Sequence, residues 1–338
     1  MVAVDVMSGE RPPETIIRGA ARTVVEHGVE VILVGDEECI KSTLNKIKFD
    51  DWKRLKIQHA SEVIGMHEVP SIACKKKKDA SIMVCTKLVK EGIAEGVYSP
   101  GNTGAALVAS VMNMGKLEGV YRPALSSYIP TAKGHSLLID AGANVDCIPE
   151  YLAQFAIMGE VFAKKVQGKK NPSIGVLSIG REKSKGNDLT LKTYNILKEL
   201  DINFVGNIEG FDISDGDVDV IVCDGFTGNI TLKVTERVFQ LTFEYVAQEV
   251  ESHLLQRIGY ALLYPAVKNM NKKIDHREFG GAPLLGLEGS IVIGHGIADA
   301  LAAYNGVRMV NSLVKNKFND LMIKRLDEFG LRKRINSS

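Results

Sequence analysis

The sequence predicts an α/β protein built on a mainly parallel sheet with helices on both faces. Short apolar runs, such as residues 2–5, 30–34 and 218–223, alternate along the chain with amphipathic helical segments. Strands that are apolar throughout are typical of parallel sheets buried on both faces. The 32 glycines among 338 residues exceed the usual share of about 7%, and many fall in loops directly after these runs.

The first half of the chain alternates strands and helices in a regular order. A strand over 2–5 leads to a helix that begins at Pro13 and ends near Gly28, since proline suits a first helical turn and glycine a helix end. The uncharged segment 96–115 has about the length of a membrane span, but a polar turn divides it into a strand and a buried helix. The other elements expected here are a strand at 30–34, a helix around 36–47, a strand at 56–59 and a helix at 79–91.

The second half continues this rhythm. Apolar runs predict strands at 136–140, 173–179 and 218–223, with helices at 149–165 and from about 225 to 253. Pro265 interrupts the next helical pattern and predicts a turn between two helices there. Residues 279–286 are expected to form a loop of small residues, and His295, framed by two glycines, to stand at the start of another helix. We expect one large domain over 1–338, a protruding helical tip at 250–273, and a basic C-terminal helix and tail at 316–338.

Composition and missing motifs exclude several classes of protein. Lys and Arg number 42 and Asp and Glu 41, and the resulting net charge of +1 argues against a whole-chain grip on nucleic acid. The five cysteines are odd in number and form no CxxC pair, and no signal peptide is apparent, which indicates a reducing cytoplasm. No P-loop, GxSxG, HExxH or EF-hand pattern occurs, and no GxGxxG follows the first strand. We therefore expect no metal, no cofactor and no covalent nucleophile.

Two glycine loops that follow predicted strands suit an oxyanion. Gly101-Asn102-Thr103-Gly104 precedes a helix, so its backbone N–H groups and the helix dipole point toward one place. Residues 224–229 repeat the pattern after another strand. In each case the alternative interpretation is a tight turn with a capping side chain.

Further polar groups are expected at the same edge of the sheet. Residues 180–187 carry three cations, and arginine can bind a phosphate bidentately while lysine supplies a mobile point charge. Residues 140–144 and 207–210 each add a carboxylate or an amide, and His295 is a candidate anion ligand. The alternatives are a solvated basic loop and a structural histidine.

Two surface features stand out. Between Glu251 and Asp275 the chain carries no acidic residue, several leucines and tyrosines, and the cations Arg257, Lys268, Lys272 and Lys273. Such a tip suits an anionic membrane surface, and the alternative is a dimer contact or a core helix. The run of four lysines at 75–78 is a solvated face or a docking site for an acidic protein.

Taken in order, the motifs resemble those of the bacterial phosphate acyltransferases of phospholipid synthesis. The resemblance runs from residue 2 to about residue 310. Ser8 and Glu10 differ from the Asp-Ala-Met-Gly-Gly-Asp opening of that family, and Arg11 replaces a histidine that is frequent after it. The matching motifs are Asp5-x-Met7-x-Gly9, Gly101-Asn102-Thr103-Gly104, Asp140-x-Gly142-Ala143-Asn144, Lys185-Gly186-Asn187, Asn207-Ile208-Glu209-Gly210, Asp224-Gly225-Phe226-Thr227-Gly228-Asn229 and Gly280-Gly281-Ala282-Pro283-Leu284-Leu285-Gly286.

The resemblance implies an activity, a fold and partners. An acyl group would pass from acyl carrier protein to inorganic phosphate, without a cofactor, and a glycerol-3-phosphate acyltransferase would consume the acyl phosphate. The implied fold is a Rossmann-like three-layer α/β/α sandwich, related to phosphotransacetylases and isocitrate-type dehydrogenases, with a protruding helical hairpin. The implied protein is a cytoplasmic homodimer that associates peripherally with the inner face of the membrane.

On this basis we expect four catalytic residues. Lys185 and the 101–104 backbone would bind phosphate, Asn229 and His295 would donate to the oxyanion, and Asp224 would orient Lys185 or accept a phosphate proton. The expected substrate contacts are Asp5, Gly101, Asn102, Thr103, Gly104, Asn144, Arg181, Asn187, Glu209, Thr227, Gly228 and Gly281. The expected membrane tip consists of Leu254, Leu255, Ile258, Leu262, Leu263 and Tyr264.

Three other functions stay open from the sequence. A short-chain phosphotransacetylase would use coenzyme A thioesters in place of the carrier protein. A metal- and nicotinamide-dependent decarboxylating dehydrogenase would need clustered aspartates, which are scattered here. A scaffold without enzyme activity would bind membranes through the tip alone.

Overall fold

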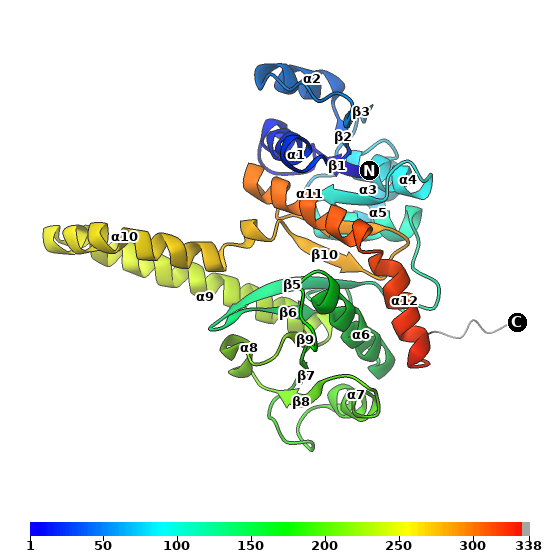
Figure 1. Cartoon of the computed structure of the whole chain (residues 1–338), viewed down its shortest axis with the longest axis vertical. Coiled ribbons are helices and arrows are strands. Elements are labelled where there is room, and N and C mark those ends of the chain that lie inside the picture. The colour runs from blue at the N-terminus through cyan, green and yellow to red at the C-terminus, as the bar shows by residue number, and fades with distance from the viewer. Residues whose placement is uncertain (333–338) are drawn as a thin grey trace, which may run out of the picture.

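The computed structural model describes residues 1–332, except for the side chains of Ser252, Lys272, Lys273 and His276. Residues 333–338 of the C-terminal helix and tail predicted at 316–338, and the side chains of the tip lysines Lys272 and Lys273, therefore lie outside what is described. The chain forms one eleven-stranded sheet in the order β3-β2-β1-β4-β11-β10-β5-β6-β9-β7-β8, with helices on both faces (Figure 1). The expected α/β class with a mostly parallel sheet is confirmed.

The strands coincide with the apolar runs of the sequence, with four additions. Strands β5, β8, β10 and β11 were not predicted as strands, because prolines such as Pro130 and Pro283 and flanking glycines are typical of loops. Residues 282–285 of the predicted loop 279–286 are thus a strand. The strands are β1 (Val2–Asp5), β2 (Val31–Gly35), β3 (Leu55–His59), β4 (Gly96–Ser99), β5 (Ala124–Thr131), β6 (Gly134–Ile139), β7 (Ile174–Leu177), β8 (Phe204–Ile208), β9 (Val220–Val222), β10 (Ala282–Leu285) and β11 (Ser290–Ile293).

The two halves of the sheet run in opposite directions. β10 is antiparallel to β11 and to β5, and β5 is antiparallel to β6, whereas the other neighbouring strands are parallel. The strands from β6 to β8 therefore run against β1–β4. The prediction that all polar loops share one edge is wrong, because it did not include these reversals. Loops from the two halves instead approach the central strands from opposite directions.

Alternate residues of each strand enter two separate cores. Along β1, Val2 and Val4 belong to the core on one face and Ala3 to the core on the other. The first core is covered by α1 (Pro13–His27), α2 (Glu37–Lys46), α6 (Pro149–Lys165), α7 (Asp188–Lys198), α11 (Ala300–Lys315) and α12 (Phe318–Glu328). The second is covered by α3 (Pro70–Lys76), α4 (Ser81–Lys90) and α5 (Thr103–Asn113), with α8 (Asp212–Asp215) and the first turns of α9 beside them.

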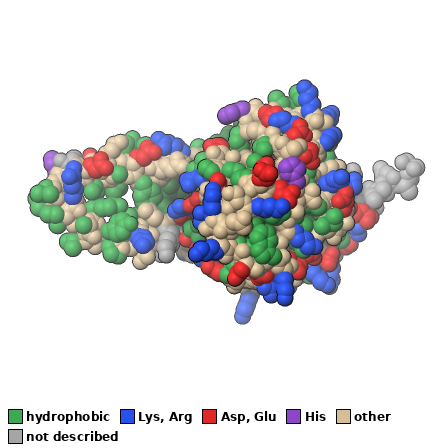
Figure 2. Space-filling model, turned by 90° about the horizontal axis from the view of Figure 1, so that it is seen from above, with side chains coloured by type: hydrophobic (Ala, Val, Ile, Leu, Met, Phe, Trp, Pro, Cys, Tyr) green, Lys and Arg blue, Asp and Glu red, His purple; other side chains and the backbone are tan. Residues whose placement is uncertain are grey.

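Two long helices project from this body as a hairpin (Figure 1). They are α9 (Gly225–Ser252) and α10 (Leu254–Ile274), followed by the short 3-10 helix η1 (His276–Glu278). The turn lies at His253, and Pro265 lies inside α10, so the predicted turn at Pro265 is wrong. Figure 2 shows apolar side chains gathered on this hairpin, which we call the α9–α10 hairpin.

A buried ion pair joins α6 to α12. Arg325 Nε and Nη2 donate to the two carboxylate oxygens of Glu160 at 3.0 and 3.1 Å, and Lys164 Nζ donates at 2.6 Å. Burial disfavours the charged form of Glu160, but these two cations outweigh it and hold the pKa of the carboxyl below its ordinary 4.5. A lowered pKa stabilises the folded state above the unfolded pKa and loses that effect as the pH falls through the folded value.

We expect Glu160→Gln to lower the free energy of unfolding by about 3 kcal/mol near neutral pH. In acid the wild-type carboxyl is protonated and resembles the amide, so the difference between the two proteins should shrink. Urea unfolding of both proteins across this pH range measures the difference. A difference that stays constant down to acid pH would contradict the assignment of this stability to the charged pair.

Candidate active site

A cavity of about 1190 Å³ lies over the central strands, between the start of α5 and the α9–α10 hairpin. Residues of the second core, such as Leu125 and Leu284, form its floor. Tyr128 and Phe279 stack in its wall with ring centroids 4.1 Å apart, and burial raises the pKa of the Tyr128 hydroxyl to about 12. The cavity brings together five of the predicted site residues, namely Thr103, Gly104, Asn229, Gly281 and His295.

The loop before α5 divides into structural and cavity-lining residues. Asn102 caps the helix, because its Oδ1 accepts from Ala105 N at 3.1 Å, and its Nδ2 donates to Met66 O at 3.0 Å. Gly101 has no room for a side chain, since a Cβ there would lie 2.4 Å from the Cβ of Ser8. The capping interpretation therefore holds for Asn102, while Thr103 and Gly104 face the cavity at the positive end of the helix dipole.

Asp5 was expected to contact substrate, but it is fully buried. Its Oδ2 accepts from Ser8 Oγ at 2.6 Å and from Ser99 Oγ at 2.8 Å, and its Oδ1 accepts from the N–H groups of Met7 and Ser8. All four hydrogen bonds are local to β1 and β4. Asp5 therefore positions the loop after β1 against the end of β4.

Asp140 organises the loop after β6, and the sequence analysis did not place it among the site residues. Its carboxylate accepts from the N–H groups of Leu125, Gly142, Ala143 and Asn144 and from Asn144 Nδ2, at 2.7 to 3.1 Å. Burial raises the pKa of Asp140 although these bonds oppose the shift. Asn144 Nδ2 also donates to Pro123 O at 2.7 Å, so the side chain of Asn144 supports the loop. The sequence feature that could have identified Asp140 is its position directly after an apolar run.

The first turn of α9 presents Asn229 to the cavity. Asp224 caps this helix, accepting from Thr227 N and from Thr227 Oγ1 at 2.8 Å each. A Cβ at Gly228 would lie 1.9 Å from Asp140 O, so glycine is what allows the helix to pack this closely against the loop after β6. The side chain of Asn229 packs beside Gly142 and is exposed to the cavity. In the described part of the chain no protein group accepts from its amide.

The basic loop at 180–187 is separate from the cavity. Arg181 pairs with Asp212 and lies 3.8 Å from Glu209, and Asn187 caps α7 by accepting from Thr190 N at 2.9 Å. Asn207 Nδ2 donates to Lys185 O at 3.2 Å and so fixes the backbone of the loop. The side chain of Lys185 is exposed and forms no ion pair with Asp224 or another described residue.

His295 lies in a loop and not at the start of a helix as predicted. The helix α11 begins at Ala300 and is capped by Asp299. His295 is exposed to the cavity, and its Nδ1 accepts from Ile297 N at 3.3 Å. On the same wall Gly280 has φ +81° and lies so close to α11 that a Cβ would be 2.0 Å from Gly306 N.

No strong nucleophile accompanies these donors in the described residues. Burial, with the charge of Asp140 next in importance, raises the pKa of the Cys147 thiol to about 12, and a protonated thiol is a weak nucleophile. Among residues 1–332 the described side chains offer no group of three His, Cys, Asp or Glu that could hold a metal ion. The site thus offers hydrogen-bond donors beside a large apolar cavity, which suits transfer of an acyl group to a nucleophile that is itself an anion.

Sequence reasoning missed the wall of the cavity. Residues of α9 between 232 and 250 line it, together with Tyr260, Val267 and Met270 of α10. The sequence contained evidence for this wall, because α9 carries apolar residues on two faces. Leu232 and Phe239 face the cavity, whereas Val234 and Val238 face solvent.

Comparisons with known proteins agree with this geometry. A family model described as "Fatty acid synthesis protein" matches residues 1–321. The chain is 46% identical over 332 residues to the phosphate acyltransferase of Leptospira biflexa, covering 97% of each chain. It is 43% identical over 329 residues to that of Dictyoglomus turgidum, covering 97% of this chain and 98% of the relative.

Solved structures share the fold. A phosphotransacetylase from Streptococcus pyogenes has a TM-score of 0.65 at 18% identity and covers 93% of this chain and 94% of its own. A 4-hydroxythreonine-4-phosphate dehydrogenase from Klebsiella pneumoniae has a TM-score of 0.51 at 13% identity, covering 93% and 99%. The expected likeness to phosphotransacetylases is thus confirmed for the fold.

Proposed function

The chain belongs to the phosphate acyltransferase family and is a phosphate acyltransferase, and from this premise we propose its substrates. The acyl donor is a long-chain acyl-[acyl-carrier-protein], the acceptor is inorganic phosphate, and the products are acyl phosphate and free carrier protein. The reaction supplies phospholipid synthesis, where a glycerol-3-phosphate acyltransferase consumes the acyl phosphate.

The apolar cavity carries this proposal. Its lining follows α9 from Asn229 to Glu251, about 33 Å of helix axis at ~1.5 Å per residue, whereas the polar donors Asn229 and His295 lie at one end. Burying an alkyl chain contributes about 0.8 kcal/mol per methylene. A short acyl group would leave most of this surface unused, which favours a long-chain donor over the short-chain phosphotransacetylase alternative.

The proposed mechanism needs no covalent enzyme intermediate. Phosphate, held by the N–H groups of Thr103 and Gly104, attacks the thioester carbonyl carbon, so that a C–O bond forms and the C–S bond breaks. Asn229 Nδ2 and His295 Nε2 donate to the oxyanion of the tetrahedral intermediate, and the thiolate of the carrier protein leaves and takes the proton that the attacking hydrogen phosphate gives up. Holding phosphate beside the carbonyl replaces an encounter in solution, and the donors stabilise the developing charge.

The decisive experiment is incubation of the protein with palmitoyl-[acyl-carrier-protein] and phosphate. We expect free carrier-protein thiol and an equal amount of acyl phosphate, trapped as the hydroxamate. Acetyl-coenzyme A in place of the carrier thioester tests the phosphotransacetylase alternative, and absorbance with a nicotinamide cofactor and Mg²⁺ tests the dehydrogenase alternative. If no carrier protein is released in the presence of phosphate, the proposed substrates are wrong.

Lys185 is proposed to supply positive charge for phosphate from the 180–187 loop, which does not itself line the cavity. Its exposed amine has no ion-pair partner in the described residues, and the backbone of its loop is held by Asn207. We expect Lys185→Ala to raise KM for phosphate by about tenfold, because that is the binding free energy lost with one hydrogen bond to a charged group. The free energy of unfolding should be unchanged. Lys183→Ala, in the same loop, is the control. Equal KM values in wild type and Lys185→Ala would remove Lys185 from the scheme.

The far end of the α9–α10 hairpin is proposed to bind the inner face of the membrane. Leu254, Leu255, Ile258, Leu262, Leu263 and Tyr264 are all exposed, and Leu255 is 83% exposed. Arg257 and Lys268 add positive charge there. None of the helices in the described residues is long and apolar enough to cross a bilayer, so the proposed contact is interfacial.

We expect Leu255→Gln/Leu262→Gln to lose sedimentation with vesicles that contain anionic lipid. Two buried leucines are worth about 3–6 kcal/mol, so binding should fall at least a hundredfold. The matched control is Val25→Gln, which replaces an exposed apolar residue of α1 outside the hairpin. Vesicle binding equal to wild type in the hairpin variant would contradict the assignment.

A second copy of the chain is proposed to cover the outer face of α9. Phe226, Ile230, Val234, Val238 and Tyr245 form an exposed stripe at mainly four-residue spacing, the pattern of helix pairing. A measured mass of one chain in solution would contradict the homodimer.

The lysine run at 75–78 is less available to an acidic carrier protein than predicted, because Lys77 Nζ donates to Val63 O and Glu68 Oε1.

A further inference from the structure

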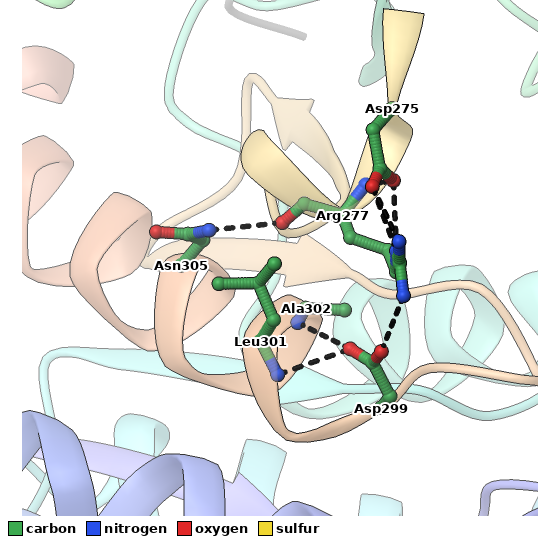
Figure 3. Close-up of polar contacts among 6 residues, drawn as sticks. All are labelled: Asp275, Arg277, Asp299, Leu301, Ala302 and Asn305. Carbon is green, nitrogen blue, oxygen red and sulfur yellow. Dashed lines mark hydrogen bonds and ion pairs between the residues drawn. The ribbon is translucent and has the colours of Figure 1, made fainter. Parts of the chain in front are cut away.

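The base of the α9–α10 hairpin is tied to the body by one arginine between two carboxylates (Figure 3). Arg277 Nη2 donates to Asp275 Oδ2 at 2.6 Å, and Nε donates to Asp275 Oδ1 at 2.9 Å. Arg277 Nη1 donates to Asp299 Oδ2 at 2.9 Å. We call Asp275, Arg277 and Asp299 the Arg277 clamp. Asp275 directly follows α10, whereas Asp299 belongs to the body, so the clamp spans the junction.

The body side of the clamp is itself rigid. Asp299 Oδ1 accepts from Leu301 N and Ala302 N at 3.0 and 2.9 Å and so caps α11. Asn305 Nδ2 donates to the backbone carbonyl of Arg277 at 3.0 Å. The first two turns of α11 therefore hold both the side chain and the backbone of Arg277 (Figure 3).

The clamp lies where the two walls of the cavity meet. Asp275 and Arg277 line the cavity just after α10, and His295, four residues before Asp299, lines it as well. Gly280, three residues after Arg277, packs directly against α11. A movement of α10 away from the body would therefore have to separate Asp275 from Asp299 first.

Energy considerations distinguish this role from a general contribution to stability. The side chain of Arg277 is 46% exposed, and exposed ion pairs contribute only about 0–1 kcal/mol to folding. The hydrogen bonds that Arg277 donates to Asp275 and Asp299 raise its pKa, so Arg277 keeps its charge at every physiological pH. A small free energy is enough to bias the position of a projecting hairpin whose other connection to the body is the start of α9.

We propose that Arg277 is a positioning residue that fixes the α10 wall of the cavity relative to the body and thereby sets the preference for long acyl chains. This inference rests on the proposed function. A long chain extends between the two walls, whereas an acetyl group reaches only the donors at Asn229 and His295. Loosening the clamp should therefore impair long-chain donors selectively, because a wall displaced by about 1 Å weakens contacts along the whole chain.

The test compares palmitoyl and acetyl thioesters of the carrier protein on purified full-length variants. For Arg277→Gln we expect the ratio of the two kcat/KM values, long over short, to fall at least about tenfold. Arg277→Lys, which supplies a point charge without the planar fork, should give an intermediate ratio. The matched control is Arg325→Gln, since Arg325 also bridges two carboxylates, Glu160 and Glu328, but far from the cavity.

The control separates positioning from folding. Arg325→Gln should lower the unfolding temperature more than Arg277→Gln, since its partner Glu160 is almost fully buried, yet leave the ratio of kcat/KM values unchanged. An unchanged ratio in Arg277→Gln, or an equal fall in Arg325→Gln, would overturn the proposal.

Hydrogen exchange provides a readout that needs no substrate. In Arg277→Gln we expect faster exchange in the backbone of 275–280 and 295–302, with no change in α6. Absence of that local increase overturns the clamp. If wild type releases no carrier protein while the local increase is seen, the proposed substrates fail and the clamp stands as a structural device.

Discussion

Asn229→Ala is expected to lower kcat by about 10²–10³, the effect of losing one donor to a tetrahedral oxyanion. The reason is geometric, because Asn229 is the residue of α9 that the structure presents to the cavity beside Gly142 with no protein acceptor for its amide in the described residues. Stopped assays of acyl phosphate formation at saturating phosphate measure the change.

The matched control is Asn195→Ala, an exposed asparagine of α7 far from the cavity, which should leave kcat unchanged. Asn229→Asp is a second test, since a carboxylate in that place cannot donate and repels phosphate, so it should be at least as damaging as alanine. A kcat within about twofold of wild type for Asn229→Ala, well short of the expected loss, would show that another group stabilises the oxyanion.

Gly228→Ala is expected to cost about 3 kcal/mol of unfolding free energy or more, as overpacking of a rigid contact does. A Cβ at Gly228 would lie 1.9 Å from Asp140 O and 2.9 Å from Cys223 Sγ. The carbonyl oxygen cannot withdraw easily, because five donors hold the carboxylate of the same residue. Chemical unfolding measures the loss, and activity should fall with it because Asn229 is the next residue.

The control for this substitution is Gly259→Ala, also in the interior of a helix. A Cβ at Gly259 meets nothing within 4 Å, and alanine there should stabilise the helix by up to about 1 kcal/mol. The two variants have the same change in composition and opposite expected signs. A Gly228→Ala protein as stable as wild type would mean that α9 and the loop after β6 separate without penalty.

Much of the fold could be predicted because its signals are local. The helix α1 begins at Pro13 and ends before Gly28, and α6 spans the residues that its pattern predicted. The capping roles of Asn102 and Asp224 were weighed from their positions alone. These features depend on a few neighbouring residues, so a single sequence contains them.

The rest depends on contacts between distant segments. The reversal of the sheet at β10 and β5 follows from pairing partners that no local pattern reveals, and it decides which loops meet. Asp5 looks like a ligand at a strand end, but Ser99 lies close enough to engage it internally. Pro265 disrupts a helix in isolation, yet α10 continues through it. The clamp at Arg277 needs Asp299, twenty-two residues away.

The length of α9 has a mechanical consequence. The helix has 28 residues, about 42 Å at ~1.5 Å per residue, and its fixed end is the turn packed on Asp140. Asn229 lies about 6 Å along it at the same rise per residue, so a swing about this pivot moves the far end roughly seven times as far. Displacements of the outer end, at the lipid surface that we propose it contacts, are therefore reduced to a small fraction of their size at Asn229.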